Sequence, residues 1–534
     1  MKNLLEWGRS KIETEDHVKR QRYATLLFLF LFLYSLYPVA AADDKLHTLT
    51  LLQMNDVYEL FPVQTEVDGA PVSRGGLAYA ATLIAQQRRE GPTLLLHAGD
   101  LLFPSLLSNK LKHQGAQMIA AFNLLQVDLA TFGNHEFDQG CRVLATRLTE
   151  SQFPWVSANV DLPKEANLPA EKVQPYRILK VAGLRIGIFG LTIPLAPVGG
   201  CGPTPITFRA PIEAAREAIA QLKKEKVDLI LALTHLPMAQ DRALAETFPE
   251  IDLIIGGHDH KVMEGVVGKT LITKAGENVT GLGLVGIKAV RAGRGWVVEK
   301  SWRRAPVDPS RVAADPQVEA ALAPYAEEIT PFYQVIGEAA VPLDLREETV
   351  RGGESNFGDY VADILRSVMG TDAALVNGGS FRDDRIIKPG PITLRDLYMA
   401  LPYQNEMVAI EITGRQLIDA LENGVSMTEK RAGRFPQVSG ISFTFDPRQP
   451  VGHRVTEAKI NGEPIDPGRK YSLATVDFLA RRGEIDGYAF QPLPIVRSGG
   501  ELNEAVLQTL KTMGPIKTEA EGRIVRIGKE NGDF

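Results

Sequence analysis

The chain has 534 residues, more than one ordinary hydrophobic core organises, so we expect at least two domains. Its composition, 44% hydrophobic and 23% charged, is that of a globular protein. The net charge of −6 argues against a basic groove for polymeric nucleic acid. A small anionic substrate would need local positive charge, from metal ions or from a few arginines.

The N-terminus has the pattern of an export signal. Charged residues up to Arg22 precede an apolar run over 24–36, and small residues follow at 40–42. This order predicts a secretory signal peptide (residues 1–42) that is cleaved after Ala42. An uncleaved membrane anchor through residues 23–42 is the alternative. Either interpretation makes the protein exported: periplasmic, extracellular, or anchored and facing outside.

A first α/β domain is predicted over residues 43–305, because apolar β-rich runs alternate there with helical patterns. The predicted strands are Leu46–Met54, Thr93–His97, Val127–Phe132, Leu184–Leu191, Val227–Leu233 and Ile251–Ile255. The predicted helices between them include Gly76–Glu90, Gln114–Leu125 and Ala210–Lys226. Val285–Val298, which contains a Gly-Arg-Gly turn, is expected to form a hairpin that closes the domain.

A linker is predicted over residues 306–334, where Pro and Ala are frequent and Val318–Glu328 has the pattern of one helix. A second mixed α/β domain is expected over 335–530, with an early helix near Gly358–Met369. The two cysteines, Cys141 and Cys201, are too few for a disulfide scaffold, although they could pair in an oxidising compartment. Without a Cys-rich zinc signature, any metal must be held by His, Asp, Asn or similar ligands.

Five of the predicted strands are followed directly by side chains of the metal-binding type. Because ligands bind at the carboxyl ends of strands in α/β sheets, we expect these side chains to converge. The five segments are Asn55-Asp56-Val57-Tyr58, Gly99-Asp100, Gly133-Asn134-His135-Glu136-Phe137-Asp138, Thr234-His235 and Gly256-Gly257-His258-Asp259-His260.

Carboxylates, imidazoles and an amide of this kind can hold two divalent ions about 3.5–4 Å apart. Such a pair activates water and neutralises the charge that grows on a phosphoryl group. Taken singly, a Gly-Asp or Asn-His pair is usually a turn or a solvated loop, and we expect His97 and His453 to lie in solvated loops. The ordered set of five favours a dinuclear metal centre.

These motifs resemble the calcineurin-like metallophosphoesterases. The second half of the chain resembles the C-terminal domain of the 5′-nucleotidase family through Arg351 with Glu354–Gly358, Asn377–Arg382, Pro402-Tyr403, Gln437–Gly440 and Asp477–Ala480. The resemblance implies a four-layer α/β metallophosphoesterase sandwich followed by a mixed α/β substrate-binding domain. It also implies a nucleotide phosphohydrolase of the 5′-nucleotidase, 2′,3′-cyclic phosphodiesterase or UDP-sugar hydrolase type.

The resemblance further implies roles for individual residues. It implies two divalent or mixed-valence ions (Mn, Zn, Fe or Ca), which Asp100 would bridge, with Asp56 and His260 on one ion and Asn134, His235 and His258 on the other. His135 would be the catalytic histidine, and Asp138 would orient it. Arg351 and Arg382 would contact phosphate or ribose, Tyr403 and Phe478 would stack on the base, Asn377 would face the nucleoside, and Asp486 would bind the ribose hydroxyls.

The chain departs from the family pattern in two places. Tyr58 stands where the family has a histidine, and we expect it either to bind one metal as a phenolate, which favours ferric iron, or to leave that position to water. The loop over 479–488 is longer than the family's Gly-Gly-Asp-Gly turn and carries Arg481 and Arg482, which leaves the preferred base open.

Two alternatives remain open at the level of sequence. The thiosulfate-processing proteins of sulfur oxidation share this architecture, although the aromatic pair Tyr403 and Phe478 favours a nucleoside. A non-catalytic surface protein that binds nucleotides is supported only by Tyr58, while the His135–Asp138 pair argues against it.

Overall fold

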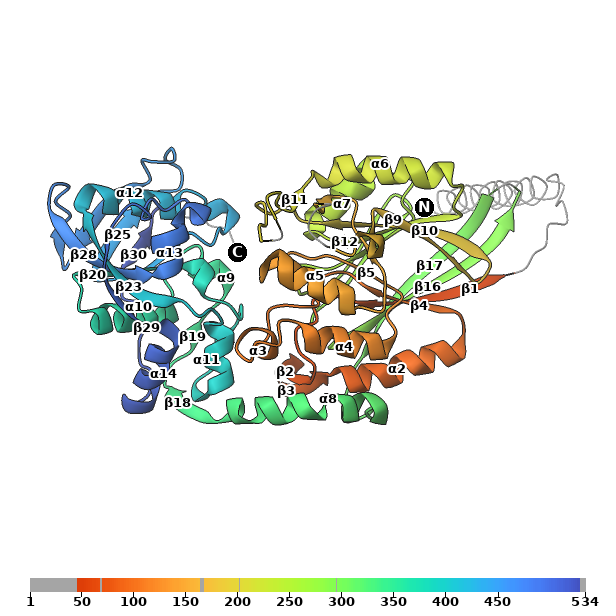
Figure 1. Ribbon diagram of the computed structural model, residues 1–534, viewed down its shortest axis with the longest axis horizontal. Coiled ribbons are helices and arrows are strands. Elements are labelled where there is room, and N and C mark those ends of the chain that lie inside the picture. The colour runs from red at the N-terminus through yellow and green to blue at the C-terminus, as the bar shows by residue number, and fades with distance from the viewer. Residues whose placement is uncertain (1–45, 68–69, 164–167, 201, 294, 529–534) are drawn as a thin grey trace, which may run out of the picture.

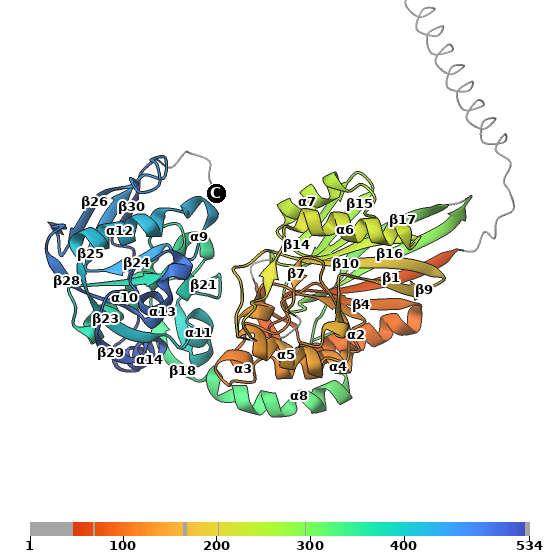
Figure 2. The same ribbon diagram turned by 45° about the horizontal axis from the view of Figure 1, so that its top comes forward.

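The computed structural model describes residues 46–67, 70–163, 168–200, 202–293 and 295–528. The predicted signal peptide or anchor over residues 1–42 lies outside the described part of the chain. Within the described residues, no helix is both long and apolar enough to cross a membrane. The chain folds into two bodies, which lie side by side in both ribbon views (Figures 1 and 2).

Two stacked sheets form the centre of the first body. One sheet has the order β17-β16-β1-β4-β5-β6-β8, formed by Gly295–Pro306, Gly281–Ala292, His47–Met54, Thr93–His97, Leu129–Thr131, Trp155–Val156 and Val173–Gln174. The other has the order β14-β15-β13-β12-β10-β9, formed by Val262–Val267, Thr270–Ala275, Leu253–Gly256, Leu229–His235, Leu184–Thr192 and Tyr176–Val181. The predicted strands and the closing hairpin are confirmed, with bounds that differ by a few residues.

Apolar side chains from both sheets form a shared core, which includes Leu51, Leu96, Ile188, Leu231 and Val285. Helices cover the outer face of each sheet. On the first sheet these are α2, α4, α5 and α8 (Leu77–Glu90, Ala116–Leu125, Gly140–Glu150 and Pro316–Ile329), and on the second they are α6 and α7 (Pro211–Lys224 and Met238–Thr247). The result is the expected four-layer sandwich of helices, two sheets and helices.

The connection between the bodies runs along the first one. Helix α8 buries Val318, Leu322 and Ile329 in the core that α2 and α4 also line, and Figure 1 shows it lying beneath these helices. The helix begins at an Asp315 cap, whose side chain accepts the backbone N–H groups of Gln317 and Val318. A 3₁₀ turn over Thr330–Tyr333 then leads to β18 (Val335–Ala339) of the second body.

The second body contains two further sheets. A five-stranded sheet, β24-β20-β28-β23-β29, is formed by Pro436–Ser439, Ala373–Asn377, Lys470–Val476, Glu406–Thr413 and Ile495–Glu501. A four-stranded sheet, β27-β26-β25-β30, is formed by Glu463–Pro464, Val455–Ile460, Ile441–Phe445 and Ile524–Arg526. The larger helices are α10 (Asn356–Met369), α11 (Leu394–Ala400), α12 (Gly414–Val425), α13 (Asp477–Arg482) and α14 (Leu502–Thr512). The predicted early helix is confirmed as α10.

One expectation about an isolated histidine is wrong. His97 is the last residue of β4 and is fully buried, with its ring edge-on to Phe122 at a centroid distance of 4.9 Å. Burial lowers its pKa to about 3, so the imidazole is neutral. His453 is exposed in a turn, as expected.

The buried carboxyl of Asp359, in the first turns of α10, makes the stability of the protein depend on pH. Burial raises its pKa to about 9; the Arg523 guanidinium opposes this rise, and the carboxylates of Glu354 and Asp363 add to it. The folded protein therefore holds a proton that the unfolded chain, with an Asp pKa near 3.9, releases. Stability is lost as the pH rises from about 4 towards 9, by up to about 1.4 kcal/mol per pH unit for this group.

We expect Asp359→Asn to remove that contribution, because the amide carries no proton to lose. The variant should be more stable than the wild type at pH 8, with a gain that shrinks as the pH falls towards 5. Urea denaturation of both proteins at pH 5, 6, 7 and 8 measures this difference. A gain that is constant across this range would contradict the titration of Asp359.

Candidate metal centre

The loops after five strands meet at one edge of the sandwich. β1, β4 and β5 run parallel in the first sheet, and β12 and β13 run parallel in the second, so their carboxyl ends share an edge. Asp56, Asp100, the segment 133–138, His235 and the segment 256–260 follow these strands or end them. The convergence expected from the sequence is thus present in the fold.

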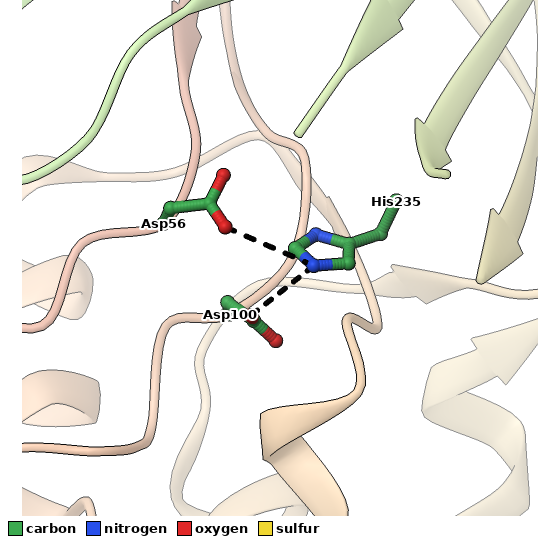
Figure 3. Close-up of side chains that lie close together, drawn as sticks. All are labelled: Asp56, Asp100 and His235. Atoms are coloured by element: carbon green, nitrogen blue, oxygen red, sulfur yellow. Dashed lines mark ion pairs between the residues drawn. The ribbon is translucent and has the colours of Figure 1, made fainter. Parts of the chain in front are cut away.

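Asp56, Asp100 and His235 form the centre of the site, and all three are fully or almost fully buried. His235 Nε2 lies 3.1 Å from Asp100 Oδ2 and 3.8 Å from Asp56 Oδ1 (Figure 3). The other ring nitrogen, Nδ1, donates to the carbonyl of Ala98 at 2.8 Å. This second contact fixes the ring so that Nε2 points at the two carboxylates.

Tyr58 and His260 lie against the same two carboxylates. The Tyr58 hydroxyl lies 2.9 Å from Asp100 Oδ2, 3.3 Å from Asp56 Oδ1 and 2.9 Å from His260 Nε2. His260 Nε2 is itself 3.3 Å from Asp56 Oδ1. The phenol therefore occupies the interior of the cluster. Burial and the two carboxylates raise its pKa well above the ordinary value.

His258 and Asn134 complete the predicted set. The His258 ring is 5.3 Å from the ring of His235, and burial together with the charge of His235 lowers its pKa to about 4. The Asn134 Oδ1 atom is buried and has no hydrogen-bond partner. Asn134 directly precedes His135, and the backbone N–H of His135 donates to Asp100 Oδ1 at 2.8 Å.

The backbone at this edge is strained where the ligand-type side chains leave it. Asp56, Asp100, His258 and His260 have φ values of 52°, 58°, 82° and 54°. Left-handed conformations cost non-glycine residues of the order of 1–3 kcal/mol, and such residues concentrate at functional sites. All four residues lie in the loops that follow β1, β4 and β13, so the strained turns occur where the chain leaves the sheets.

His135 links the centre to the second body. Its Nδ1 lies 2.8 Å from Asp138 Oδ2, and its Nε2 lies 4.0 Å from Asp100 Oδ2 and 3.1 Å from Arg382 Nη2. A guanidinium can only donate hydrogen bonds, so Nε2 accepts one from Arg382. Nδ1 therefore carries the ring proton and donates a hydrogen bond to Asp138. Burial disfavours a charged ring, but Asp138 and Asp100 raise the pKa of His135 above its ordinary value.

Glu136 is a residue of the site that the sequence interpretation did not single out. Its buried carboxylate accepts the backbone N–H groups of Asp100, Leu101, Leu102 and Gly133 at 3.0, 2.7, 3.3 and 2.5 Å. These bonds tie the loop that carries Asp100 to the loop that carries His135. The signal was present in the sequence, because an acidic residue inside a buried motif needs donors around it.

Among the predicted nucleotide-contacting residues of the second body, Arg382 contacts His135 of the first body, and two others contact each other. Asn377 Nδ2 donates to Asp486 Oδ2 at 2.9 Å. Arg351 is largely buried, and its guanidinium pairs with Glu347 at 3.0 Å. Tyr403 is 38% exposed, which leaves its ring accessible.

Two more residues of the second body, Phe478 and Arg434, belong to the proposed nucleotide-binding region. Phe478, in the first turn of α13, is half-buried against the core of the second body. Arg434 was not predicted, and it donates to Asn423 Oδ1 at 3.2 Å. Burial raises the pKa of Asp486, and the positive charges of Arg434 and Arg351 oppose that rise. Arg434 therefore adds positive charge beside Asn377 and Asp486.

Two protein-family models match the chain. Residues 49–262 match the calcineurin-like phosphoesterase model, and residues 335–491 match the 5′-nucleotidase C-terminal domain model. The crystal structure of a 5′-nucleotidase precursor from Thermus thermophilus is 32% identical in sequence, with a TM-score of 0.80. The match covers 90% of this chain and 100% of that one.

The chain belongs to the 5′-nucleotidase family. It is accordingly a metal-dependent hydrolase of phosphoric esters, and nucleotides are the substrate class of the family. The trifunctional nucleotide phosphoesterase protein YfkN of Bacillus subtilis is 31% identical over 91% of this chain, which spans 35% of that relative. The sulfate thiohydrolase SoxB of Thermus thermophilus is 21% identical with a TM-score of 0.69, and the match covers 90% of this chain and 97% of that one, which shows a shared fold alone.

The fold of a 5′-nucleotidase implies divalent metal ions, and the residues at the strand ends fit them. Asp56, Asp100 and His235 offer ligand atoms that all lie within 4.8 Å of one another. Asn134 Oδ1 is buried without a hydrogen-bond partner, which costs free energy unless a ligand satisfies it. Although burial opposes the charged imidazolium, the two carboxylates raise the pKa of His235 to about 10, so the cluster attracts a cation.

Proposed function

We propose that this protein is an exported 5′-nucleotidase-type phosphohydrolase that uses two metal ions held at the strand ends. One observation carries the proposal. His135 Nε2 lies between Asp100 of the metal centre, at 4.0 Å, and Arg382 of the second body, at 3.1 Å. A phosphoryl group bound at this point would contact the metal centre, the catalytic histidine and an arginine of the nucleotide-binding side together.

The proposed ligands divide between two positions that share Asp100. Asp56, Tyr58 and His260 lie together on one side of Asp100, and Asn134, His235 and His258 are the proposed ligands of the other position. When bound, a pair of divalent ions supplies a nucleophilic water at neutral pH and neutralises charge on the phosphoryl oxygens. The geometry supports the pairing of Tyr58 with Asp56 and His260 through direct contacts between their polar atoms.

The proposed role of His135 is to stabilise charge on the transferred phosphoryl group. Asp138 accepts a hydrogen bond from the Nδ1–H group and so fixes which ring nitrogen faces the substrate. Arg382 and Arg351 would bind phosphate oxygens or ribose, because guanidinium groups form paired hydrogen bonds with such oxygens. Tyr403 and Phe478 would stack on the base, and Asn377 and Asp486 would bind the nucleoside, with Asp486 at the ribose hydroxyls.

Purified full-length protein should hydrolyse at least one nucleotide of a panel in a metal-dependent manner, measured by chromatography of the products as well as by free phosphate. The panel consists of AMP, 3′-AMP, 2′,3′-cyclic AMP, ATP and UDP-glucose, assayed with EDTA and with Mn²⁺, Zn²⁺, Ca²⁺ or iron added back. The nucleotides that are hydrolysed identify the preferred phosphate position, and the ions that restore activity after EDTA identify the metal. Absence of hydrolysis of every nucleotide, with sulfate release from a thiosulfate conjugate, would instead support the thiosulfate-processing alternative.

Export is supported by the pattern of residues 1–42 and by the disulfide bond that Cys141 carries. Disulfides persist in oxidising compartments and are rare in the cytosol. Fractionation of expressing cells, with N-terminal sequencing of the mature protein, distinguishes a peptide cleaved after Ala42 from a retained anchor. Activity confined to the cytoplasmic fraction would contradict the proposal.

Tyr58 provides a separate prediction about the metal content. We expect Tyr58→Phe to weaken metal binding, because the variant loses an oxygen that lies within 3.3 Å of Asp56, Asp100 and His260. Tyr58→His should restore two ions while lowering the proportion of iron, since an imidazole is a softer ligand than a phenolate. Elemental analysis of the purified proteins measures both effects.

Tyr471→Phe serves as the control, since it also removes a buried hydroxyl that is hydrogen-bonded, but in the second body. Its metal content should equal that of the wild type. Identical metal content in wild type, Tyr58→Phe and Tyr58→His would mean that the phenol is not a ligand.

A further inference from the structure

A buried lysine lies directly behind the metal centre. Lys274, in strand β15, has a side chain that is only 1% exposed. Its ammonium contacts four oxygen atoms: the carbonyls of Leu236 and Gly257 at 2.5 and 2.6 Å, Asp241 Oδ2 at 2.9 Å and Asp259 Oδ2 at 2.6 Å. A fully buried ammonium is rare, and it requires partners of this kind.

Three of these four contacts reach a residue next to a proposed metal ligand, and the fourth acts through Thr234. Leu236 directly follows His235, Gly257 directly precedes His258, and Asp259 stands between His258 and His260. Asp241, on helix α7, accepts the hydroxyl of Thr234 at 2.7 Å, and Thr234 directly precedes His235. Asp259 also accepts the backbone N–H of Met238, at the start of α7. Lys274 thus joins the two loops that carry the three histidines.

The backbone of Gly256 and Gly257 separates Lys274 from the metal centre. A Cβ added to Gly256 would lie 3.0 Å from Asp241 Oδ2 and 3.3 Å from Lys274 Cε. A Cβ added to Gly257 would lie 2.8 Å from His235 Nδ1 and 3.0 Å from Asp56 Oδ2. With no side chain at these two positions, a displacement of the ammonium is transmitted directly to the ligand loops.

Stability alone does not account for an ion cluster at this position. Replacing a buried ion pair by apolar side chains of similar volume is often neutral or stabilising, so such a cluster is weak evidence for a stabilising role. Metal ligands, by contrast, must be held within about 0.5 Å of the productive geometry by the groups behind them.

We propose that Lys274 is a positioning residue of the metal centre, which ties the loop of His235 to the loop of His258 and His260 and fixes the separation of their rings. The inference rests on the proposed function for the identity of the ligands. Lys274 itself contacts neither metal nor substrate. Its effect passes through the backbone of Leu236 and Gly257 and through the side chains of Asp241 and Asp259.

The test is the affinity of the full-length protein for Mn²⁺, measured by isothermal titration calorimetry after the bound metals have been removed. We expect Lys274→Met to bind Mn²⁺ about 10–100-fold more weakly, the effect that loss of groups supporting metal ligands typically has. Its phosphatase activity should need proportionally more Mn²⁺, and kcat at saturating Mn²⁺ should return towards the wild-type value. A purely structural role would not shift the Mn²⁺ requirement.

Lys300→Met is the matched control. Lys300, in β17, is partly buried and, like Lys274, donates to two backbone carbonyls, those of Asp252 and Lys269, at 2.7 and 2.5 Å. These contacts lie away from the ligand loops, so this variant should keep the wild-type Mn²⁺ affinity. Equal weakening by both substitutions would indicate a general loss of stability and would overturn the proposal.

Asp259→Ala is a second test variant, to be used if Lys274→Met does not fold. It removes one tie to the histidine loop and leaves Lys274 with Asp241 and both carbonyls, so the fold should persist while Mn²⁺ binding weakens. Unchanged Mn²⁺ affinity in a folded Lys274→Met or Asp259→Ala variant would overturn the proposal. Because calorimetry needs no turnover, a wild type that binds Mn²⁺ but cleaves no nucleotide would refute the proposed function alone.

Discussion

Replacing His135 by alanine is expected to lower kcat for nucleotide hydrolysis by roughly 10²–10³-fold, the usual effect of removing one positioned group that stabilises charge in the transition state. The imidazole contacts the second body and lies close to the proposed metal bridge, with Nε2 3.1 Å from Arg382 and 4.0 Å from Asp100. The metal content should stay at the wild-type level, because His135 is not among the proposed ligands. Steady-state kinetics with elemental analysis of the same samples measures both quantities.

The His113–Glu328 pair offers a matched control for this substitution. His113 Nε2 lies 2.7 Å from Glu328 Oε2, close to the 2.8 Å that separates His135 from Asp138, but the pair lies outside the metal centre. His113→Ala should leave kcat unchanged. Asp138→Asn should reduce kcat by a smaller factor than His135→Ala, since it perturbs the orientation and charge of a ring that is still present. Wild-type activity in His135→Ala would refute the proposed mechanism.

The first body and its metal centre were predictable because two regular features of α/β proteins fix them. The strand pattern gives the sheets, and parallel strands bring their carboxyl ends to one edge. Asp56, Asp100 and His235 are therefore neighbours even though 179 residues separate the first from the last (235 − 56). Chain order and strand periodicity were sufficient for this part of the site.

His97 was misjudged because the end of a strand is not always the start of a loop. It is paired in register with Met54 of β1 and Ala130 of β5, so its backbone is still inside the sheet. Its side chain consequently points into the helix-covered face, where Phe122 packs on it. A buried neutral imidazole at this position has the same sequence pattern as an exposed one, and only the packing of α4 distinguishes them.

The supporting residues of the site were missed for a different reason. Glu136 and Lys274 act through backbone carbonyls and N–H groups, which leave no pattern of spacing in a sequence. Lys274 gave one signal, because it is the single charged residue in the strand Thr270–Ala275, which is buried along its whole length. The contact between Arg382 and His135 joins residues that are 247 positions apart, and it depends on how the two bodies meet.

Asp100→Asn should have the largest effect on metal binding, because Asp100 is the proposed bridging carboxylate and lies close to His235, Tyr58 and His135. Its Oδ2 lies 3.1 Å from His235, 2.9 Å from Tyr58 and 4.0 Å from His135. Removing one partner of a buried charged cluster costs about 3–5 kcal/mol. That free energy corresponds to a loss of roughly 10²–10⁴-fold in metal affinity.

We therefore expect Asp100→Asn to be purified with less than one metal ion and to show no measurable nucleotide hydrolysis at metal concentrations that saturate the wild type. Asp128→Asn is the control: Asp128 accepts the N–H of Leu95 at 2.7 Å on the opposite edge of the same sheet, and an amide oxygen there preserves the hydrogen bond. Calorimetric titration of the metal-free proteins with Mn²⁺ and Zn²⁺ compares the variants directly. If Asp100→Asn bound two ions with wild-type affinity, Asp100 could not be the bridging ligand, and the two-metal proposal would have to be rebuilt around Asp56.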